Sequence, residues 1–255
     1  MSTALPFSIQ RISHQANTSI DEHWHEQAQL LVVLHGTASL LINGERWLVL
    51  ERQGIWIDKD IAHSVTYGKH SEMLLLLFSA AKCEVPSKPF YFSNLLLELL
   101  EEALRVYDTA DVSQALALIN PLILYCITNS QHDGQLHLLG GSDRRLTRAI
   151  ACLNQQPGIW LNLVELANHA GCSAKTLSRL FTAETGISFI QWREKFSIMT
   201  AMERLAQGQS VSQVALDLGY QSVGNFSTMF SRVMKIPPGK FTITAAKGYI
   251  AATDH

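Results

Sequence analysis

Residues 162–181 read NLVELANHAGCSAKTLSRLF, and residues 210–230 read SVSQVALDLGYQSVGNFSTMF. Each segment has an apolar stretch with a small alanine, then a glycine, then a second stretch with a large apolar residue at every fourth position. That spacing predicts a short helix, a glycine-bearing turn and a second helix, which is the layout of a helix-turn-helix. In this motif the second helix can enter the major groove of DNA. The chain carries the pattern twice.

The apolar residues and the turn glycines of the two segments match position by position. Leu163, Leu166, Ala167, Gly171, Leu177 and Phe181 of the first correspond to Val211, Val214, Ala215, Gly219, Phe226 and Phe230 of the second, after one extra turn residue. Ser173 and Ser222 are the expected N-caps of the second helices. The side chains left exposed are then Ala174, Lys175, Ser178 and Arg179 in the first segment, and Val223, Gly224, Asn225, Ser227 and Thr228 in the second.

Charge is divided unevenly along the 255 residues, whose formal net charge is −2. Residues 1–142 hold 8 Lys/Arg against 15 Asp/Glu, a net charge of −7, and residues 143–255 hold 12 against 7, a net charge of +5. The basic part is the one that would approach a polyanion. No apolar run is long enough for a membrane span, no secretion signal is expected, and the four cysteines form no pattern typical of disulfides or zinc. These features predict a cytoplasmic protein with no membrane partner.

Short apolar runs separated by turn signals fill the first 80 residues. The predicted strands are Leu30–Leu34, Ala38–Ile42, Arg46–Leu50, Gly54–Ile57, Ser64–Tyr67 and Met73–Phe78, with a hairpin signal at Asn43-Gly44. Many short strands at close spacing indicate an antiparallel sandwich or small barrel.

Four side chains in this region, His23, His25, Gln29 and His63, have the chemistry of a binding pocket. Two histidines two apart on one strand would project to the same side, and a third from a neighbouring strand could complete a metal triad. The stretch resembles the cupin barrel, because the His-x-His pair, a strand-ending glycine and His63 occur in the order of the two cupin motifs. The resemblance implies a cupin-like sensor barrel.

The pattern departs from that of metal-binding cupins. Gln29 stands where they usually carry Glu, and Tyr67 where their second motif carries Asn. The loss of an anionic ligand favours an empty pocket, or a pocket for a small organic molecule, over a metal at His23, His25 and His63. A divalent metal is the alternative, as are histidines that only hydrogen-bond at the barrel mouth. A metal-dependent cupin enzyme fused to a DNA-binding module is the competing function, which the missing carboxylate disfavours.

Two amphipathic helices are predicted after the strands, Asn94–Val106 and Val112–Ile127, with Pro121 expected to kink or split the second. Packing against the barrel and a homodimer interface are equally consistent with their leucines. The chain is thus predicted to be α+β with two domains. The boundaries are a cupin-like sensor barrel at 1–85, a helical segment at 86–130, a linker at 131–142 and an all-α domain with two helix-turn-helix motifs at 143–255.

A family resemblance covers residues 143 to about 245. The second segment and the residues after it resemble the signature of AraC/XylS-type transcription regulators, with Ala215-x3-Gly219-Tyr220-x-Ser222-x3-Phe226-x3-Phe230 and then Pro237-Pro238-x2-Phe241. The first segment, and a connecting helix over Phe189–Ala206 with Trp192-Arg193, are also similar to the family pattern. A cupin-like sensor ahead of this domain fits the family arrangement.

The resemblance implies a sequence-specific, non-enzymatic transcription regulator that binds double-stranded DNA, responds to a small-molecule effector and contacts RNA polymerase. By position, Lys175, Ser178 and Arg179 would contact one major-groove segment and Gly224, Asn225 and Thr228 the other, with Ala174 and Val223 beside them and Arg232 on phosphate. A protein-interaction module is the remaining alternative.

Several positions depart from the family pattern. Thr228 stands where relatives often have Arg, and Gly224 offers no side chain. Ser197 occupies a commonly basic position of the connecting helix, and Lys235 replaces the usual Gly of the closing turn. We therefore expect the first motif to carry most base discrimination and the second mainly to position the protein on phosphate.

Overall fold

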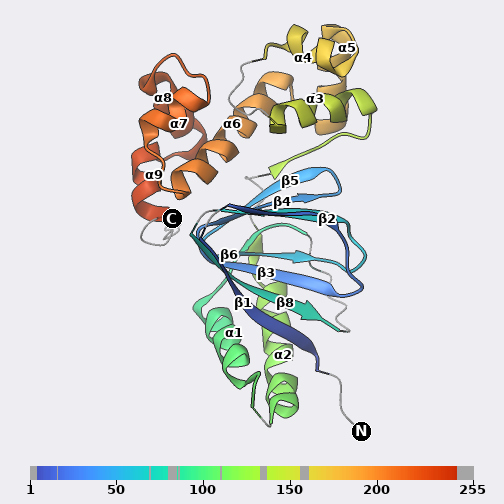
Figure 1. Ribbon diagram of the computed structural model, residues 1–255, viewed down its shortest axis with the longest axis vertical. Coiled ribbons are helices and arrows are strands. Elements are labelled where there is room, and N and C mark those ends of the chain that lie inside the picture. The colour runs from blue at the N-terminus through green and yellow to red at the C-terminus, as the bar shows by residue number, and fades with distance from the viewer. Residues whose placement is uncertain are drawn as a thin grey trace. The chain divides into compact units, whose positions relative to one another are not determined.

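The computed structural model describes residues 5–15, 17–68, 70–79, 85, 87–109, 111–132, 137–155 and 161–245 (Figure 1). The chain divides into two compact units, residues 1–42 with 47–135 and residues 43–46 with 136–255. Each unit is described by itself. Within the described ranges, no helix is both long and apolar enough to cross a membrane.

The first unit contains two antiparallel sheets. One has the order β1-β8-β3-β6-β9-β10, and the other contains the run β5-β4-β7-β2. The strands are β1 (Phe7–His14), β2 (Thr18–His23), β3 (Ala28–His35), β4 (Thr37–Ile42), β5 (Glu45–Leu50), β6 (Gln53–Ile57), β7 (His63–Tyr67), β8 (Ser71–Phe78), β9 (Phe90–Tyr91) and β10 (Gln131–His132).

Strand β3 shows why the first sheet lies in the middle of this unit. Leu31 and Val33 belong to a buried cluster that also holds Val65 of β7, so this side of β3 faces the second sheet. Leu30 and Val32 point to the other side and belong to a separate buried cluster. Because both faces of β3 are covered, its sequence is a continuous apolar run rather than an alternating one.

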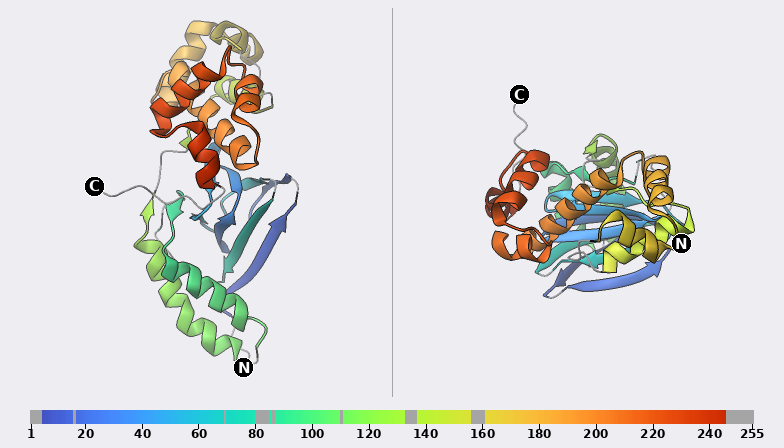
Figure 2. Two further views of the ribbon diagram at one scale, coloured as in Figure 1. Left: turned by 90° about the vertical axis from the view of Figure 1, so that its left-hand side faces the viewer. Right: turned by 90° about the horizontal axis from the view of Figure 1, so that it is seen from above.

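The second of these clusters is closed by α1 (Asn94–Val106) and α2 (Val112–Thr128), which lie side by side (Figures 1 and 2). Leu96 and Leu100 of α1 and Ile123 of α2 are buried in the same cluster as Leu30. The helices therefore pack on the sheet, one of the two interpretations of their leucines. Helix α2 runs unbroken through Pro121, so the split helix that the proline allowed does not form.

The expected closed barrel is not what the described residues form. Strand β1 pairs with β8 in one sheet and β2 pairs with β7 in the other, so each sheet keeps an edge strand of its own. The fold is two facing sheets, the sandwich alternative that the strand spacing also permitted. All six predicted strands are present, extended by one to three residues, and Asn43 and Gly44 both have the positive φ of a type I′ hairpin turn.

The second unit is helical. Its helices are α3 (Arg144–Gln155), α4 (Leu163–Ala170), α5 (Ala174–Thr185), α6 (Phe189–Ala206), α7 (Val211–Asp217), α8 (Val223–Met234) and α9 (Pro238–Ala245), after a two-residue strand β11 (His137–Leu138). The two helix-turn-helix motifs, α4–α5 and α7–α8, are confirmed, and α6 connects them over the predicted residues. Strands β10 and β11 lie in the stretch for which a linker was expected.

The large apolar residues that match between α5 and α8 have the predicted burial. Leu177 and Phe181 of α5 and Phe226 and Phe230 of α8 are all fully buried. The small residues Ala167 and Ala215, on the first helix of each motif, are buried as well. The repeated sequence frame is thus a repeated core, and it fixes which sides of α5 and α8 are exposed.

The ends of α5 and α8 differ in a way that can be tested. Gly186 closes α5 with a left-handed φ of 72°, and Lys235 closes α8 with a φ of 60°. A residue with a Cβ is strained in this region by roughly 1 kcal/mol. We expect Lys235→Gly to raise the free energy of unfolding by about 0.5–1 kcal/mol and Gly186→Ala to lower it by about 1 kcal/mol, measured by urea unfolding. A loss of stability in Lys235→Gly would contradict this account.

Candidate DNA-binding surface and sensor site

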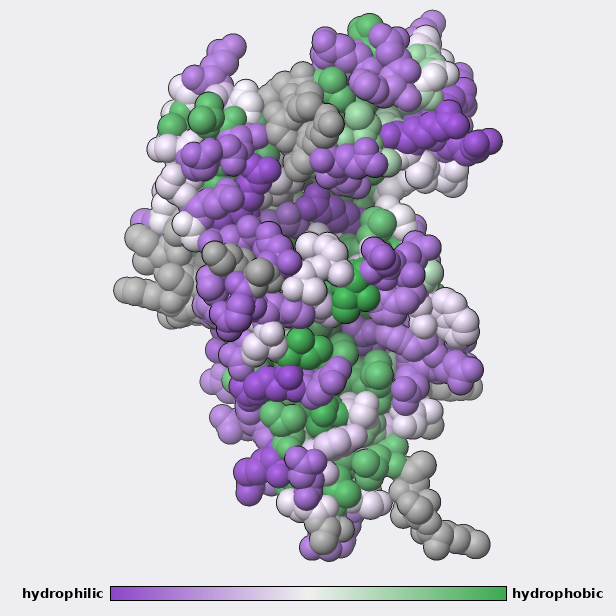
Figure 3. All heavy atoms as spheres, in the orientation of Figure 1, coloured by the Kyte–Doolittle hydropathy of each residue, from purple (hydrophilic) through white to green (hydrophobic). Residues whose placement is uncertain are grey.

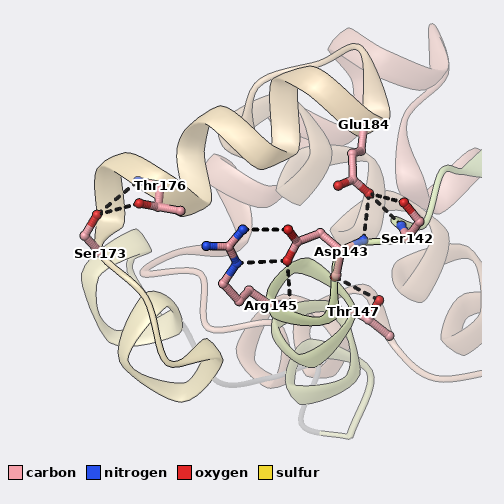
Figure 4. A network of polar contacts seen from close by, with 7 residues as sticks. All are labelled: Ser142, Asp143, Arg145, Thr147, Ser173, Thr176 and Glu184. Carbon is pink, nitrogen blue, oxygen red and sulfur yellow. Dashed lines mark hydrogen bonds and ion pairs between the residues drawn. The ribbon is translucent and has the colours of Figure 1, made fainter.

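Local capping holds the first helix-turn-helix in place. Asn162 and Glu165 form a capping box at the start of α4, and Gly171 ends α4 in the left-handed conformation. After a short turn, the Ser173 hydroxyl accepts a hydrogen bond from the Thr176 backbone N–H at 3.2 Å and starts α5 (Figure 4). These caps satisfy backbone groups that would otherwise lack partners, so the turn between the helices is fixed.

The exposed side of α5 carries two long cationic side chains. Lys175 and Arg179 lie one turn apart, and both are exposed, while Ala174 and Ser178 beside them are half-buried. Neither cation makes a hydrogen bond or ion pair within the described part of the chain. Arginine and lysine on the second helix of such a motif can reach base edges and phosphates, which is the role expected for both.

The exposed side of α8 has a different chemistry. The Ser222 hydroxyl caps α8 by accepting from the Asn225 N–H at 3.1 Å, and Val223, Gly224, Asn225 and Thr228 are exposed as predicted. Arg232 lies two turns further along, and its guanidinium donates to the Glu194 carboxylate of α6 at 2.6 Å. The cation expected on phosphate is thus paired with the connecting helix in this structure.

The connecting helix α6 is attached to both motifs by buried side chains. Trp192 stacks on Phe196 and contacts Phe181 of α5, and its indole N–H donates to the Leu139 carbonyl at 3.0 Å. At the second motif, the Tyr220 side chain makes a hydrogen bond with Ser197 of α6, and burial raises the pKa of Tyr220. Ser197 is buried, so it supports the turn of the second motif rather than standing where a basic residue would meet DNA.

A polar network connects the start of α3 to the end of α5 (Figure 4). The Glu184 carboxylate accepts from the backbone N–H groups of Ser142 at 2.6 Å and Asp143 at 3.1 Å. Arg145 donates twice to Asp143, at 2.9 and 2.6 Å, and these bonds lower the pKa of Asp143 to about 2. Arg145, one of the basic residues at the edge of α3, is therefore occupied in the structure and does not add a free charge.

Three histidines of the first unit come together in space. His23 ends β2 and lies opposite His63, which begins β7, and His25 follows two residues after the end of β2. One ring nitrogen of each histidine lies within 4.8 Å of the others, and the ring centroids are 4.5–5.1 Å apart. The expected triad thus forms, although His25 lies outside the strand that ends at His23. The Asp60 N–H donates to the His25 carbonyl at 2.9 Å and holds that turn.

The surroundings of His63 and His25 lower the pKa of both side chains. Burial lowers the pKa of His63 more than its hydrogen bond to the Ile61 carbonyl raises it, and the charges of His23 and His25 lower it further. Burial, together with the charge of His23, also lowers the pKa of His25. Gln29 is buried on the side of β3 that carries Leu31 and Val33, and so it faces the space between the sheets.

Two known families match this chain, one in each unit. The helix-turn-helix domain family matches residues 166–242, and the AraC-like ligand binding domain matches residues 9–84. Together the matches cover well over half of the chain, and they contain the exposed faces of α5 and α8 and the histidine triad. The chain belongs to the AraC family of transcription regulators.

Individual relatives agree with this assignment of an AraC-family regulator. This chain is 28% identical over 223 residues to the HTH-type transcriptional regulator NimR of Escherichia coli K12, and the alignment covers 86% of this chain and 81% of NimR. A putative AraC-like transcription regulator of Streptomyces lividans is 25% identical to this chain over 209 residues, and the alignment covers 81% of this chain and 64% of that regulator. The solved structure of ToxT from Vibrio cholerae O395 aligns over 94% of this chain and 98% of its own at 12% identity, with a TM-score of 0.41, too distant to bear on the site.

Proposed function

We propose that this AraC-family regulator recognises a specific DNA sequence mainly through the first helix-turn-helix, while the second mainly positions it. The observation that supports this asymmetry is the contrast between two exposed helix faces on matching buried frames. Lys175 and Arg179 project from α5 without partners in the described chain, whereas α8 exposes small and neutral side chains and its Arg232 is paired with Glu194. Base discrimination by bidentate hydrogen bonds requires side chains such as that of Arg179.

The regulator acts in the cytoplasm on double-stranded DNA, and it influences RNA polymerase either directly or by occupying promoter DNA. Its first unit binds a small-molecule effector between the two sheets. The unit is not an enzyme in this proposal, because the relatives that match along most of the chain are transcription regulators.

Self-association through α1 and α2 is part of the proposal. Leu118, Leu122 and Tyr125 follow one another at helical spacing on α2, and they are 70%, 49% and 65% exposed, as is Leu95 of α1 at 56%. Apolar residues are visible among the polar surface of the first unit in Figure 3. A stripe of this kind suits a second copy of the same helix across a twofold axis.

Salt dependence tests the DNA-binding proposal most directly. With a duplex selected from a random pool, the logarithm of the binding constant should fall linearly with the logarithm of salt concentration, by about 0.9 for each phosphate contacted. Lys175→Ala is expected to weaken binding to all duplexes alike and to reduce that slope by about 1. Fluorescence anisotropy measures both quantities.

Lys59→Ala is the matched control, because Lys59 is an exposed lysine of the first unit. Its slope should equal that of the wild type. A wild-type slope near zero would contradict DNA binding through phosphates and favour a protein-interaction module.

A further inference from the structure

We propose that His23, His25 and His63 bind one divalent transition-metal ion, and that the effector of the regulator coordinates this ion at an open position. This inference rests on the proposed effector-sensing function of the first unit and adds how the effector is bound. The sequence favoured a pocket without metal, because Gln29 stands where metal-binding cupins carry a glutamate; the structure leads us to propose the opposite.

Hydrogen bonds fix which ring nitrogen carries a proton in two of the three histidines. His23 Nδ1 lies 2.8 Å from the Asp21 carbonyl oxygen, and His63 Nδ1 lies 2.9 Å from the Ile61 carbonyl oxygen. A carbonyl oxygen can only accept, so each Nδ1 carries the proton and donates it. In the neutral ring the lone pair is then on Nε2. Backbone carbonyls commonly orient metal-binding histidines in this way.

His63 Nε2 is the atom that most needs a partner. The His63 side chain is 1% exposed, and its Nε2 has no hydrogen-bond partner among the described residues. A buried acceptor left without a partner costs about 1–3 kcal/mol, so such atoms are uncommon unless something else satisfies them. A metal ion shared with His23 and His25 would satisfy this one.

The spacing of the rings suits a single ion after a small adjustment. Metal–nitrogen bonds of about 2.0–2.1 Å in tetrahedral geometry separate the ligand nitrogens by about 3.4 Å. The three nitrogens lie within 4.8 Å of one another, so closing on an ion requires side-chain movement of roughly 1 Å. His23 and His25 are half-buried and can rotate, while His63 is held in place by burial and by Ile61.

The donor set selects the metal. Three neutral imidazoles without a carboxylate suit Zn²⁺, Co²⁺, Ni²⁺ or Cu²⁺ and disfavour Mg²⁺ and Ca²⁺, which prefer oxygen ligands. Three protein ligands leave a tetrahedral position open, as in catalytic zinc sites. Because the ligands are neutral, the ion keeps its full charge and attracts an anionic oxygen or a lone-pair nitrogen. The effector is therefore a small molecule with such a donor atom, and the buried amide of Gln29 on the facing sheet can orient it.

Metal binding to the full chain tests the site. After treatment with a chelator, the wild type should bind one equivalent of Co²⁺ or Zn²⁺ and no Mg²⁺, measured by calorimetry and by the visible absorption of tetrahedral Co²⁺. His25→Ala, a half-buried position that should not unfold the protein, is expected to weaken binding by at least about 100-fold, since even outer-shell changes cost about 10–100-fold. His35→Ala is the control, because His35 is an exposed histidine paired with Glu51 in the same unit. Equal affinity in His25→Ala and the wild type would overturn the site.

Two probes test the open position on the cobalt-loaded protein. Azide and imidazole should each change the Co²⁺ absorption spectrum, and an unchanged spectrum with both would overturn the open coordination position. DNA binding of the metal-free wild type is measured in a separate experiment. If the wild type binds DNA but no metal, this inference alone is overturned. If the wild type binds metal but no DNA, the proposed function is overturned.

Discussion

Replacing Trp192 with alanine is expected to lower the free energy of unfolding by about 3–5 kcal/mol, the range for a fully buried aromatic residue. Trp192 is 1% exposed, and it lies between the rings of Phe181 and Phe196. The substitution leaves a cavity where α5 meets α6, and it removes the donor to the Leu139 carbonyl. Urea unfolding of the full chain, followed by far-ultraviolet circular dichroism, measures the change.

Two further substitutions make this test specific. Trp192→Phe keeps an aromatic ring but lacks the indole N–H, so its cost should be smaller, about 1–2 kcal/mol. Trp24→Ala removes a tryptophan that is 61% exposed and should change stability by less than about 0.5 kcal/mol. If Trp192→Ala cost no more than Trp192→Phe, the packing between α5 and α6 would not be what stabilises the helical unit.

Arg179→Ala is expected to weaken binding to the specific duplex by about 1–3 kcal/mol, which is about 5- to 150-fold, while binding to unrelated DNA changes much less. The reason is that Arg179 is an exposed arginine of α5 with no partner in the described chain, and it can donate two hydrogen bonds to one guanine. Gel-shift titration of both duplexes gives the two affinities. The loss should be confined to those base pairs that the first motif contacts.

Asn225→Ala is the matched substitution on α8. Asn225 is exposed on the equivalent helix, and its backbone N–H, which the substitution keeps, donates to the capping hydroxyl of Ser222. A smaller loss than that of Arg179→Ala is expected if the second motif mainly positions the protein. A much larger loss from Asn225→Ala would reverse the assignment of the two motifs.

The helical unit was predictable from sequence because its signals are local. Buried positions recur at helical spacing, and Ser173 and Ser222 cap the helices as expected. The first unit was less so. Strand β2 was not predicted because its residues Thr18–His23 are almost all polar and exposed, which leaves no alternation to read. Strand β1 does alternate, but it is a strand because it pairs with β8, which is distant in the sequence, and this pairing cannot be predicted from the local pattern.

Long-range pairing also explains what the sequence left open about the sites. Whether the strands close into a barrel depends on the edges β1 and β2, and no local pattern specifies those edges. The pairing of Arg232 with Glu194 and of Tyr220 with Ser197 joins residues of different helices and was not foreseen. The His23, His25 and His63 triad was foreseen, but the unpartnered Nε2 of His63 required the structure. The DNA contacts themselves stay predictions.

The network around Glu184 has a consequence for how a signal could travel. The chain enters the helical unit through residues 139–143, and this short stretch is held by Trp192 of α6 and by Glu184 at the end of α5. These hydrogen bonds attach the entering chain directly to α5 and α6, and none of them involves a residue of α8. The motif that we propose to choose the DNA sequence is therefore also the one to which the entering chain is bonded.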